Sequence, residues 1–136
     1  MEDFKMTKVD YQTCCFVHLI TDFVADKNCY LLSVNNYRQI NSNKILLGYY
    51  DEEYCYFIPS VVIEMCDIIL CEEGIKKLSM RKILNRLFSL NLIKVHWVLT
   101  DNVRYRPQKR IGRTRRRYIT FYRRELEKYF WSDTKL

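Results

Sequence analysis

The stretch PSVVIEMCDIILCEEGIKKLSMRKILNRLFSLN, residues 59–91, decides the fold. Pro59 suits the first position of a helix, where its missing N–H costs no hydrogen bond. The apolar residues that follow recur at helical spacing, at Val61, Val62, Met65, Ile68 and Ile69. Gly74 is suited to the left-handed conformation that ends a helix. The pattern therefore predicts a helix over residues 59–73.

A second helix, over residues 79–90, is predicted a few residues later. Ser79 can act as its N-cap, and Asn91 can adopt the left-handed conformation that closes it. Its apolar stripe would consist of Met80, Ile83, Leu84, Leu87 and Phe88. Its outward face would carry the donor-rich side chains Arg81, Lys82, Asn85, Arg86 and Ser89. The two helices together form a helix-turn-helix in which the first helix packs across the second and holds it.

Two strands and a basic stretch follow this helix pair. Residues 92–99 and 118–122 are rich in β-branched and aromatic side chains, which favour strands. Residues 103–117, between them, are strongly basic and predict a loop. A helix-turn-helix followed by a strand, a basic loop and a strand is the element order of a winged helix. We therefore expect an α+β fold of the winged-helix type, with the basic loop as its wing.

The rest of the chain predicts additions to this core. Asp10 could cap a helix that runs to about Ala25, and residues 26–44 are mainly loop, with a possible short strand at 29–32. Residues 45–50 and 54–58 predict an additional β-hairpin with its turn at 51–53. We expect a single domain over residues 1–136, consisting of an N-terminal helix and loop (1–44), a winged-helix-like core (45–122) and a C-terminal helix or tail (123–136).

The charge of the chain is unevenly distributed. Residues 1–75 contain five Lys and Arg against twelve Asp and Glu, a net charge of −7, whereas residues 76–136 contain eighteen against four, a net charge of +14. Such a polarised molecule is expected to meet a polyanion with its basic half. A solvated basic face, or an acidic protein partner, would explain the same composition.

Between Arg104 and Arg117 the chain has eight cations in fourteen residues and no acid, and seven of the eight are arginines, whose planar group suits bidentate phosphate contact. Tyr105 and Tyr118 stand among them and could stack on bases. With the outward face of the second helix, this stretch gives the predicted nucleic-acid-binding set: Arg81, Lys82, Asn85, Arg86, Arg104, Arg106, Lys109, Arg110, Arg113, Arg115, Arg116 and Arg117.

The sequence offers little for catalysis or metal binding. Six cysteines occur without a CxxC pair, and His18 lies far along the chain from His96, so no zinc site, other metal or cofactor is expected. No carboxylates are paired with a histidine, so we expect a protein that is not an enzyme, and a small nuclease is the last of our hypotheses. No signal peptide or membrane-spanning run is recognisable, which predicts a cytoplasmic protein with reduced cysteines.

Three segments carry a resemblance to a known family. GYYDEEYCYFIPSVVIEMCDIILCEEG (48–74), SMRKILNRLFSLNLIKV (79–95) and RIGRTRRRYITF (110–121) resemble the C-terminal tail of primase–helicase proteins from phages and mobile elements. The resemblance covers residues 45–122, with Asn91 where that tail usually has glycine. The ATPase loop Gly-x-x-x-x-Gly-Lys-Ser/Thr does not occur in the chain. The resemblance implies an auxiliary nucleic-acid-contacting domain rather than a helicase.

Two functions remain as hypotheses from the sequence. The first is a winged-helix accessory or regulatory protein of a phage or mobile element that binds nucleic acid, DNA rather than RNA. The second is an inhibitor or adaptor that places its basic loop or its acidic N-terminal half on a nucleic-acid-processing protein. A homodimer could form through the first helix or through Tyr129, Phe130 and Trp131, although these aromatics could equally pack on the first helix.

Overall fold

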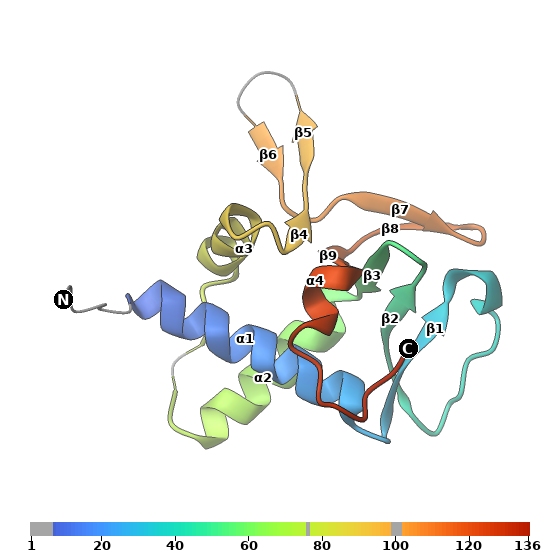
Figure 1. Ribbon diagram of the computed structural model, residues 1–136, viewed down its shortest axis with the longest axis horizontal. Coiled ribbons are helices and arrows are strands. Elements are labelled where there is room, and N and C mark those ends of the chain that lie inside the picture. The colour runs from blue at the N-terminus through green and yellow to red at the C-terminus, as the bar shows by residue number, and fades with distance from the viewer. Residues whose placement is uncertain (1–6, 76, 99–101) are drawn as a thin grey trace.

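The computed structural model describes residues 7–75, 77–98 and 102–136 (Figure 1). Its elements in chain order are α1 (Lys8–Ala25), β1 (Cys29–Ser33), the short 3₁₀ helix η1 (Val34–Asn36), β2 (Ile45–Tyr50), β3 (Tyr54–Phe57), α2 (Pro59–Glu72), α3 (Met80–Ser89), β4 (Ile93–Lys94), β5 (His96–Val98), β6 (Asn102–Arg104), β7 (Gln108–Ile111), β8 (Thr114–Arg117), β9 (Ile119–Tyr122) and α4 (Arg123–Glu127). Helices and sheet are mixed along the chain, which confirms the predicted α+β class.

A five-stranded sheet in the order β1-β2-β3-β9-β4 forms the centre of the molecule. β1 runs parallel to β2, and the other neighbouring strands of this sheet are antiparallel. The predicted hairpin is confirmed as β2 and β3. β9, near the end of the chain, lies between β3 and β4 and joins the hairpin to the segment that follows α3.

The two faces of this sheet are covered by different elements. Cys55 and Phe57 belong to a large apolar core that also contains buried residues of α1, α2 and α3. Tyr56 points to the opposite face, as expected for alternating strand positions. There it packs with Tyr118 and with Ile111 of β7 in a smaller core. The helices therefore cover one face, and the β7–β8 hairpin covers part of the other.

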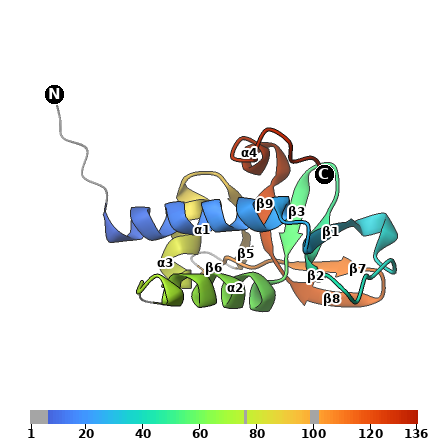
Figure 2. The same ribbon diagram turned by 90° about the horizontal axis from the view of Figure 1, so that it is seen from below.

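α1 supports α3 from the helical side of the sheet (Figure 2). The expectation was that α2 would hold α3, but α3 packs chiefly on α1, which lies beside both helices. The N-cap of α1 is Thr7, and not Asp10 as expected. Asp10 occupies the third helical position, where its carboxylate accepts a hydrogen bond from the backbone N–H of Thr7 in a capping box.

The predicted start of α2 and the predicted C-terminal ends of α2 and α3 are confirmed. Ser79 precedes α3 as predicted, but its side chain makes no capping hydrogen bond. α2 begins at Pro59, and after it Gly74 has a φ of 74°. The N–H of Ile75 then donates to the carbonyl of Leu70 at 2.8 Å. Asn91 closes α3 in the same way, with a φ of 59° and a bond from the N–H of Leu92 to the carbonyl of Leu87. Each bond satisfies a carbonyl that the end of the helix would leave unpaired.

The prediction that residues 103–117 form a loop is wrong, because most of them lie in strands β6, β7 and β8. The strand expected over 92–99 ends its pairing with β9 at Lys94, and the chain then enters β5, which pairs with β6. β7 and β8 form a further hairpin whose turn is Gly112 and Arg113. Gly112 has a φ of 63°, which suits the first position of a two-residue turn, and buried Ile111 anchors the hairpin on the sheet. The turn at Gly112 and the burial of Ile111 together give an ordered hairpin in a segment whose charge alone suggested a loop.

A bulge in β2 brings the backbones of two strands close together. Tyr30 pairs with Leu46 and Leu31 with Gly48, so Leu47 has no partner in β1 and enters the core. A Cβ atom built on Gly48 would overlap the carbonyl oxygen of Tyr56 in β3. This position therefore requires glycine.

Native thiol labelling is expected to divide the six cysteines, all of which are free thiols. Cys14 and Cys71 are exposed, whereas Cys55 and Cys66 are buried, and burial raises the pKa of both buried thiols to about 12. Because the thiolate is the reactive form, iodoacetamide should modify Cys14 and Cys71 in the folded protein, and Cys55 and Cys66 only in denaturant. Peptide mass spectrometry measures this pattern, and rapid native labelling of Cys66 would contradict the packing described here.

Within the described ranges, no helix combines the length and apolar character needed to cross a membrane.

Candidate nucleic-acid interface

Four of the predicted arginines meet around one hollow, which we call the arginine pocket. Arg81 comes from α3, Arg104 from β6, Arg106 from the segment between β6 and β7, and Arg117 from the end of β8. The hollow has a volume of about 380 Å³ and is lined by Ile63, Met80, Arg81, Leu84, Val103, Arg104, Tyr105, Arg106 and Arg117. No acidic side chain is among these lining residues. The outward face of the helix and the basic stretch, which the sequence singled out separately, thus contribute to a single basic site.

The arginines of this pocket have no carboxylate partner in the described part of the chain. The ion pairs there join Arg86 to Asp10, Arg123 to Glu127 and Lys128 to Glu125. Within the pocket, Nη1 of Arg117 donates to the carbonyl oxygen of Arg106 at 3.3 Å, which holds that side chain beside the hollow. Guanidinium groups with free donors are suited to bind the oxygens of phosphate groups.

Two of the predicted contacts on α3 are occupied within the protein. Nε of Arg86 lies 2.7 Å from Oδ1 of Asp10, and Oδ1 of Asn85 accepts a hydrogen bond from Tyr105 at 3.1 Å. The hydrogen bond from the Thr7 hydroxyl, together with Arg86, lowers the pKa of Asp10, so its carboxylate stays charged beside the guanidinium. Arg81 and Lys82 remain exposed. The cations of α3 that have no partner among the described residues and are free to bind an anion are therefore at its N-terminal end.

In the β7–β8 hairpin, positively charged residues of one strand lie directly opposite positively charged residues of the other. Arg110 lies opposite Arg115, and Lys109 opposite Arg116. Such directly opposed like charges destabilise a sheet when no counter-charge is near. The positions of Arg110, Arg115 and Arg117 share the face opposite to buried Ile111, and the whole of β8 is exposed. A bound polyanion would relieve this repulsion.

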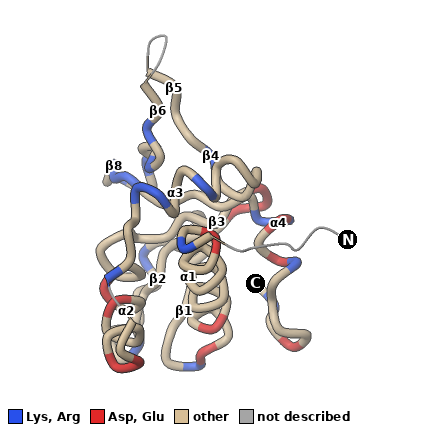
Figure 3. Tube along the Cα trace, turned by 90° about the vertical axis from the view of Figure 1, so that its left-hand side faces the viewer, with Lys and Arg blue, Asp and Glu red and all other residues tan. Residues whose placement is uncertain are grey.

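Three of the remaining predicted cations line other hollows. Arg113 and Arg116 border a hollow of about 380 Å³ with Arg38, which the sequence analysis did not single out. Lys109 borders a different hollow, described below. In Figure 3 the Lys and Arg positions of β8, α3 and β6 gather toward one end of the molecule, away from the acidic positions of α2. The predicted polarity of the sequence is therefore a polarity of the folded chain.

The two tyrosines that the sequence predicted to stack on bases are not free to do so, whereas a tryptophan is exposed. Tyr118 is only 2% exposed, and burial raises its pKa. Tyr105 is half-buried and bound to Asn85. Trp97 of β5 is 59% exposed instead, and its ring packs against Phe88 of α3 at a centroid distance of 5.9 Å. The sequence placed Trp97 within a continuous strand and so gave no sign of its exposure.

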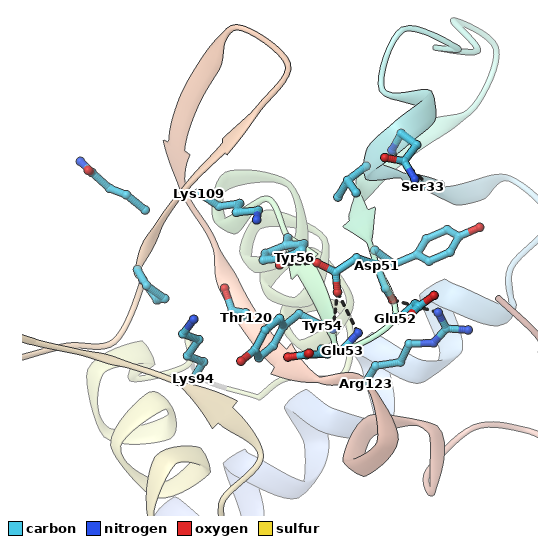
Figure 4. Close-up of a pocket in the computed structure, with 15 residues that line it drawn as sticks. Ser33, Asp51, Glu52, Glu53, Tyr54, Tyr56, Lys94, Lys109, Thr120 and Arg123 are labelled. Carbon is cyan, nitrogen blue, oxygen red and sulfur yellow. Dashed lines mark hydrogen bonds between the residues drawn. The ribbon is translucent and has the colours of Figure 1, made fainter.

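A second, larger hollow of about 680 Å³ is lined by residues of β2, β3 and β7 and of the β2–β3 turn (Figure 4). Asp51 lies at its edge and accepts hydrogen bonds from the Tyr56 hydroxyl at 2.6 Å and from the N–H of Tyr54 at 2.7 Å. Burial opposes the charge on Asp51, but these hydrogen bonds outweigh it and lower the pKa of the carboxyl group. The same hydrogen bond and burial raise the pKa of Tyr56.

Lysines complete the wall of this second hollow. Nζ of Lys94 lies 4.9 Å from the ring centre of Tyr54, and Nζ of Lys109 lies 5.5 Å from that of Tyr56. Glu52 and Glu53 also line it, so its charge is mixed. Asp51 also accepts hydrogen bonds from the N–H of Glu53 at its carboxylate and from Arg123 at its carbonyl oxygen, and these bonds fix the β2–β3 turn. Across the described residues, no group of three or more His, Cys, Asp and Glu side chains is placed to hold a metal ion.

No family model, no curated protein and no solved structure matches this chain.

Proposed function

We propose that this protein binds nucleic acid, DNA rather than RNA, through the arginine pocket and the adjoining β7–β8 hairpin. The observation that carries the proposal is the convergence of Arg81, Arg104, Arg106 and Arg117 on one hollow without an acidic neighbour. These four guanidinium groups have no carboxylate partner among the described residues, so they repel one another, and a bound anion relieves that repulsion. A chain of phosphates supplies several anions at regular spacing, which one small anion does not.

The element order supports a winged-helix reading of this surface. α2 and α3 follow one another in the chain order of a helix-turn-helix, although α3 packs chiefly on α1, and the pair of β4 and β9 corresponds to the two arms of a wing. The β5–β6 hairpin rises where a wing extends from these arms, with β7–β8 as an addition. In this reading the N-terminal end of α3 approaches the nucleic acid, and Arg81 and Lys82 are the helix residues that contact it. An accessory or regulatory role in DNA metabolism, as in a phage or mobile element, fits a small domain of this kind.

Binding should weaken steeply with salt. Each phosphate neutralised in a DNA duplex contributes about −0.9 to the slope of log K against log salt, so four arginine contacts give a slope of about −4. The affinity is then expected to fall about 100-fold between about 50 and 200 mM salt. Fluorescence anisotropy with labelled single-stranded and duplex DNA measures the slope. No binding at the lowest salt, or an affinity independent of salt, would refute the proposal.

A protein partner is the second candidate function, and one observation favours it. A hollow of about 700 Å³ runs along the outer side of α2, where Ile63 and the 54% exposed Ile68 are flanked by Glu64, Asp67 and Glu72. A partner segment with apolar and basic side chains would complement this surface. A chain with this function alone binds neither DNA nor RNA at low salt, so the same titration separates the two functions.

A further inference from the structure

We infer that the nucleic acid bound by this protein has unpaired bases, and that Trp97 on the β5–β6 hairpin stacks on one of them. The inference rests on the proposed function and adds the class of substrate. The hairpin stands out from the body of the molecule beside α3 (Figure 1). Trp97 is one of the most exposed large apolar side chains in the described part of the chain, at 59%.

The ring of Trp97 is exposed but held in place. It packs edge-to-face on Phe88 of α3, with 5.9 Å between ring centres and an interplanar angle of 71°. Phe88 in turn contacts Tyr105 at 6.4 Å, and the hydroxyl of Tyr105 donates to Asn85. This chain of contacts ties the hairpin to α3. A ring fixed in advance loses little conformational freedom when a base packs against it.

Trp97 also lies next to the arginine pocket. Its cross-strand partner in β6 is Val103, and Val103 lines that pocket. Directly paired residues have Cβ atoms about 5 Å apart, so the indole and the pocket are neighbours. On the other face of the hairpin, Arg104 pairs with His96, and both border a further basic hollow with Lys94 and Arg117. A strand whose phosphates lie among these cations therefore passes its bases beside Trp97.

Stacking of this kind distinguishes single strands from duplexes. In a duplex both faces of each base are covered by neighbouring bases, whereas an unpaired base offers a free face to an aromatic side chain. Each base stacked on an aromatic residue tightens binding about 5- to 150-fold. A Trp97 that served a protein partner would be insensitive to any oligonucleotide, so the same experiment separates that alternative.

The test uses Trp97 as its own reporter. The chain has two tryptophans, Trp97 and Trp131, so Trp131→Phe leaves a single indole on the hairpin. Trp131 lies in the C-terminal tail, where Nε1 donates to Asp22 of α1. We expect single-stranded DNA to quench the fluorescence of Trp97, and duplex DNA of the same length to leave it unchanged at equal saturation. Anisotropy of the labelled DNA reports binding independently of the indole.

Variants then measure the contribution of stacking. Trp97→Ala should weaken single-strand binding at least 5-fold and leave duplex binding within 2-fold, whereas Trp97→Phe should restore most of the loss. The matched control is Tyr129→Ala, which removes another exposed aromatic side chain, 45% exposed and outside the arginine pocket, and should change neither affinity.

The outcomes separate the inference from the proposed function. Equal binding of single strands and duplexes without quenching of Trp97 would overturn the inference and leave the proposed function standing. No binding of any DNA or RNA at low salt would overturn both. If Trp97→Ala does not fold, quenching in the Trp131→Phe protein and the affinity of Trp97→Phe still decide the question.

Discussion

Replacing Gly48 by alanine is expected to destabilise the fold by more than about 4 kcal/mol, a large fraction of the roughly 5–15 kcal/mol that stabilises a typical domain. The added Cβ would overlap the carbonyl oxygen of Tyr56 in the neighbouring strand. That oxygen belongs to the backbone of a strand paired on both sides, so it cannot move without disturbing β2, β3 and β9. Relief of the overlap must separate strands at the centre of the sheet.

Urea denaturation followed by circular dichroism measures this effect. Gly74→Ala is the matched control, because no atom lies within 4 Å of its added Cβ. Its φ of 74° alone should cost about 1–2 kcal/mol. Equal shifts of the denaturation midpoint for the two variants would show that the close approach of β2 and β3 is not a constraint on the fold.

Removing three charges from the arginine pocket is expected to weaken DNA binding at least about 1,000-fold. The triple variant Arg81→Gln, Arg106→Gln and Arg117→Gln loses three charge-assisted contacts, each of which contributes about 1.5 kcal/mol or more. The slope of log K against log salt should also become less negative by about 3. Glutamine keeps a donor at each position and reduces the change in packing.

The control for this variant removes the same charge elsewhere. Lys27, Lys44 and Arg124 are exposed and do not line the arginine pocket. Their triple replacement by glutamine should weaken binding by less than about 10-fold, because exposed charges at a distance are screened by salt. Comparable losses in the two triple variants would mean that net charge, and not the pocket, determines binding.

Much of the fold could be predicted from the sequence because the signals are local. Pro59, Gly74 and Asn91 set helix ends through their own backbone preferences, which do not depend on the rest of the chain. The β2–β3 hairpin followed from strand-favouring residues on both sides of a short acidic turn. These elements keep their predicted type and nearly their predicted bounds.

The errors arose where distant contacts override the local signal. Residues 92–99 contain no glycine or proline at which a strand would break. The pairing with β9 nevertheless ends at Lys94, and the next strand, β5, pairs with β6 instead. The ion pair between Asp10 and Arg86 joins residues far apart in the chain, so the sequence could not predict it. The hydrogen bond from Tyr105 to Asn85 was not predictable for the same reason.

The sequence predicted the arginines that contribute to the candidate site, but not how they are arranged in space. Arginine density between Arg104 and Arg117 marked the region, and the periodicity of α3 gave the outward direction of Arg81. The register of β7 and β8 decides which of these arginines share a face, and the sequence does not specify it. The exposure of Trp97 likewise depends on the projection of β5 and β6 from the sheet.

The position of β9 also determines when the protein can fold. This strand is the last of the chain, yet it lies between β3 and β4. Before β9 can pair with β3, the ends of the long segment between these two strands must come together, which costs conformational entropy that is recovered only when the strands pair. Folding should therefore be slow compared with that of helical domains of similar size. During synthesis β3 and β4 remain open edges until β9 has left the ribosome, and open edges can pair with strands of other chains. The nascent chain is therefore exposed to aggregation until β9 has emerged and paired.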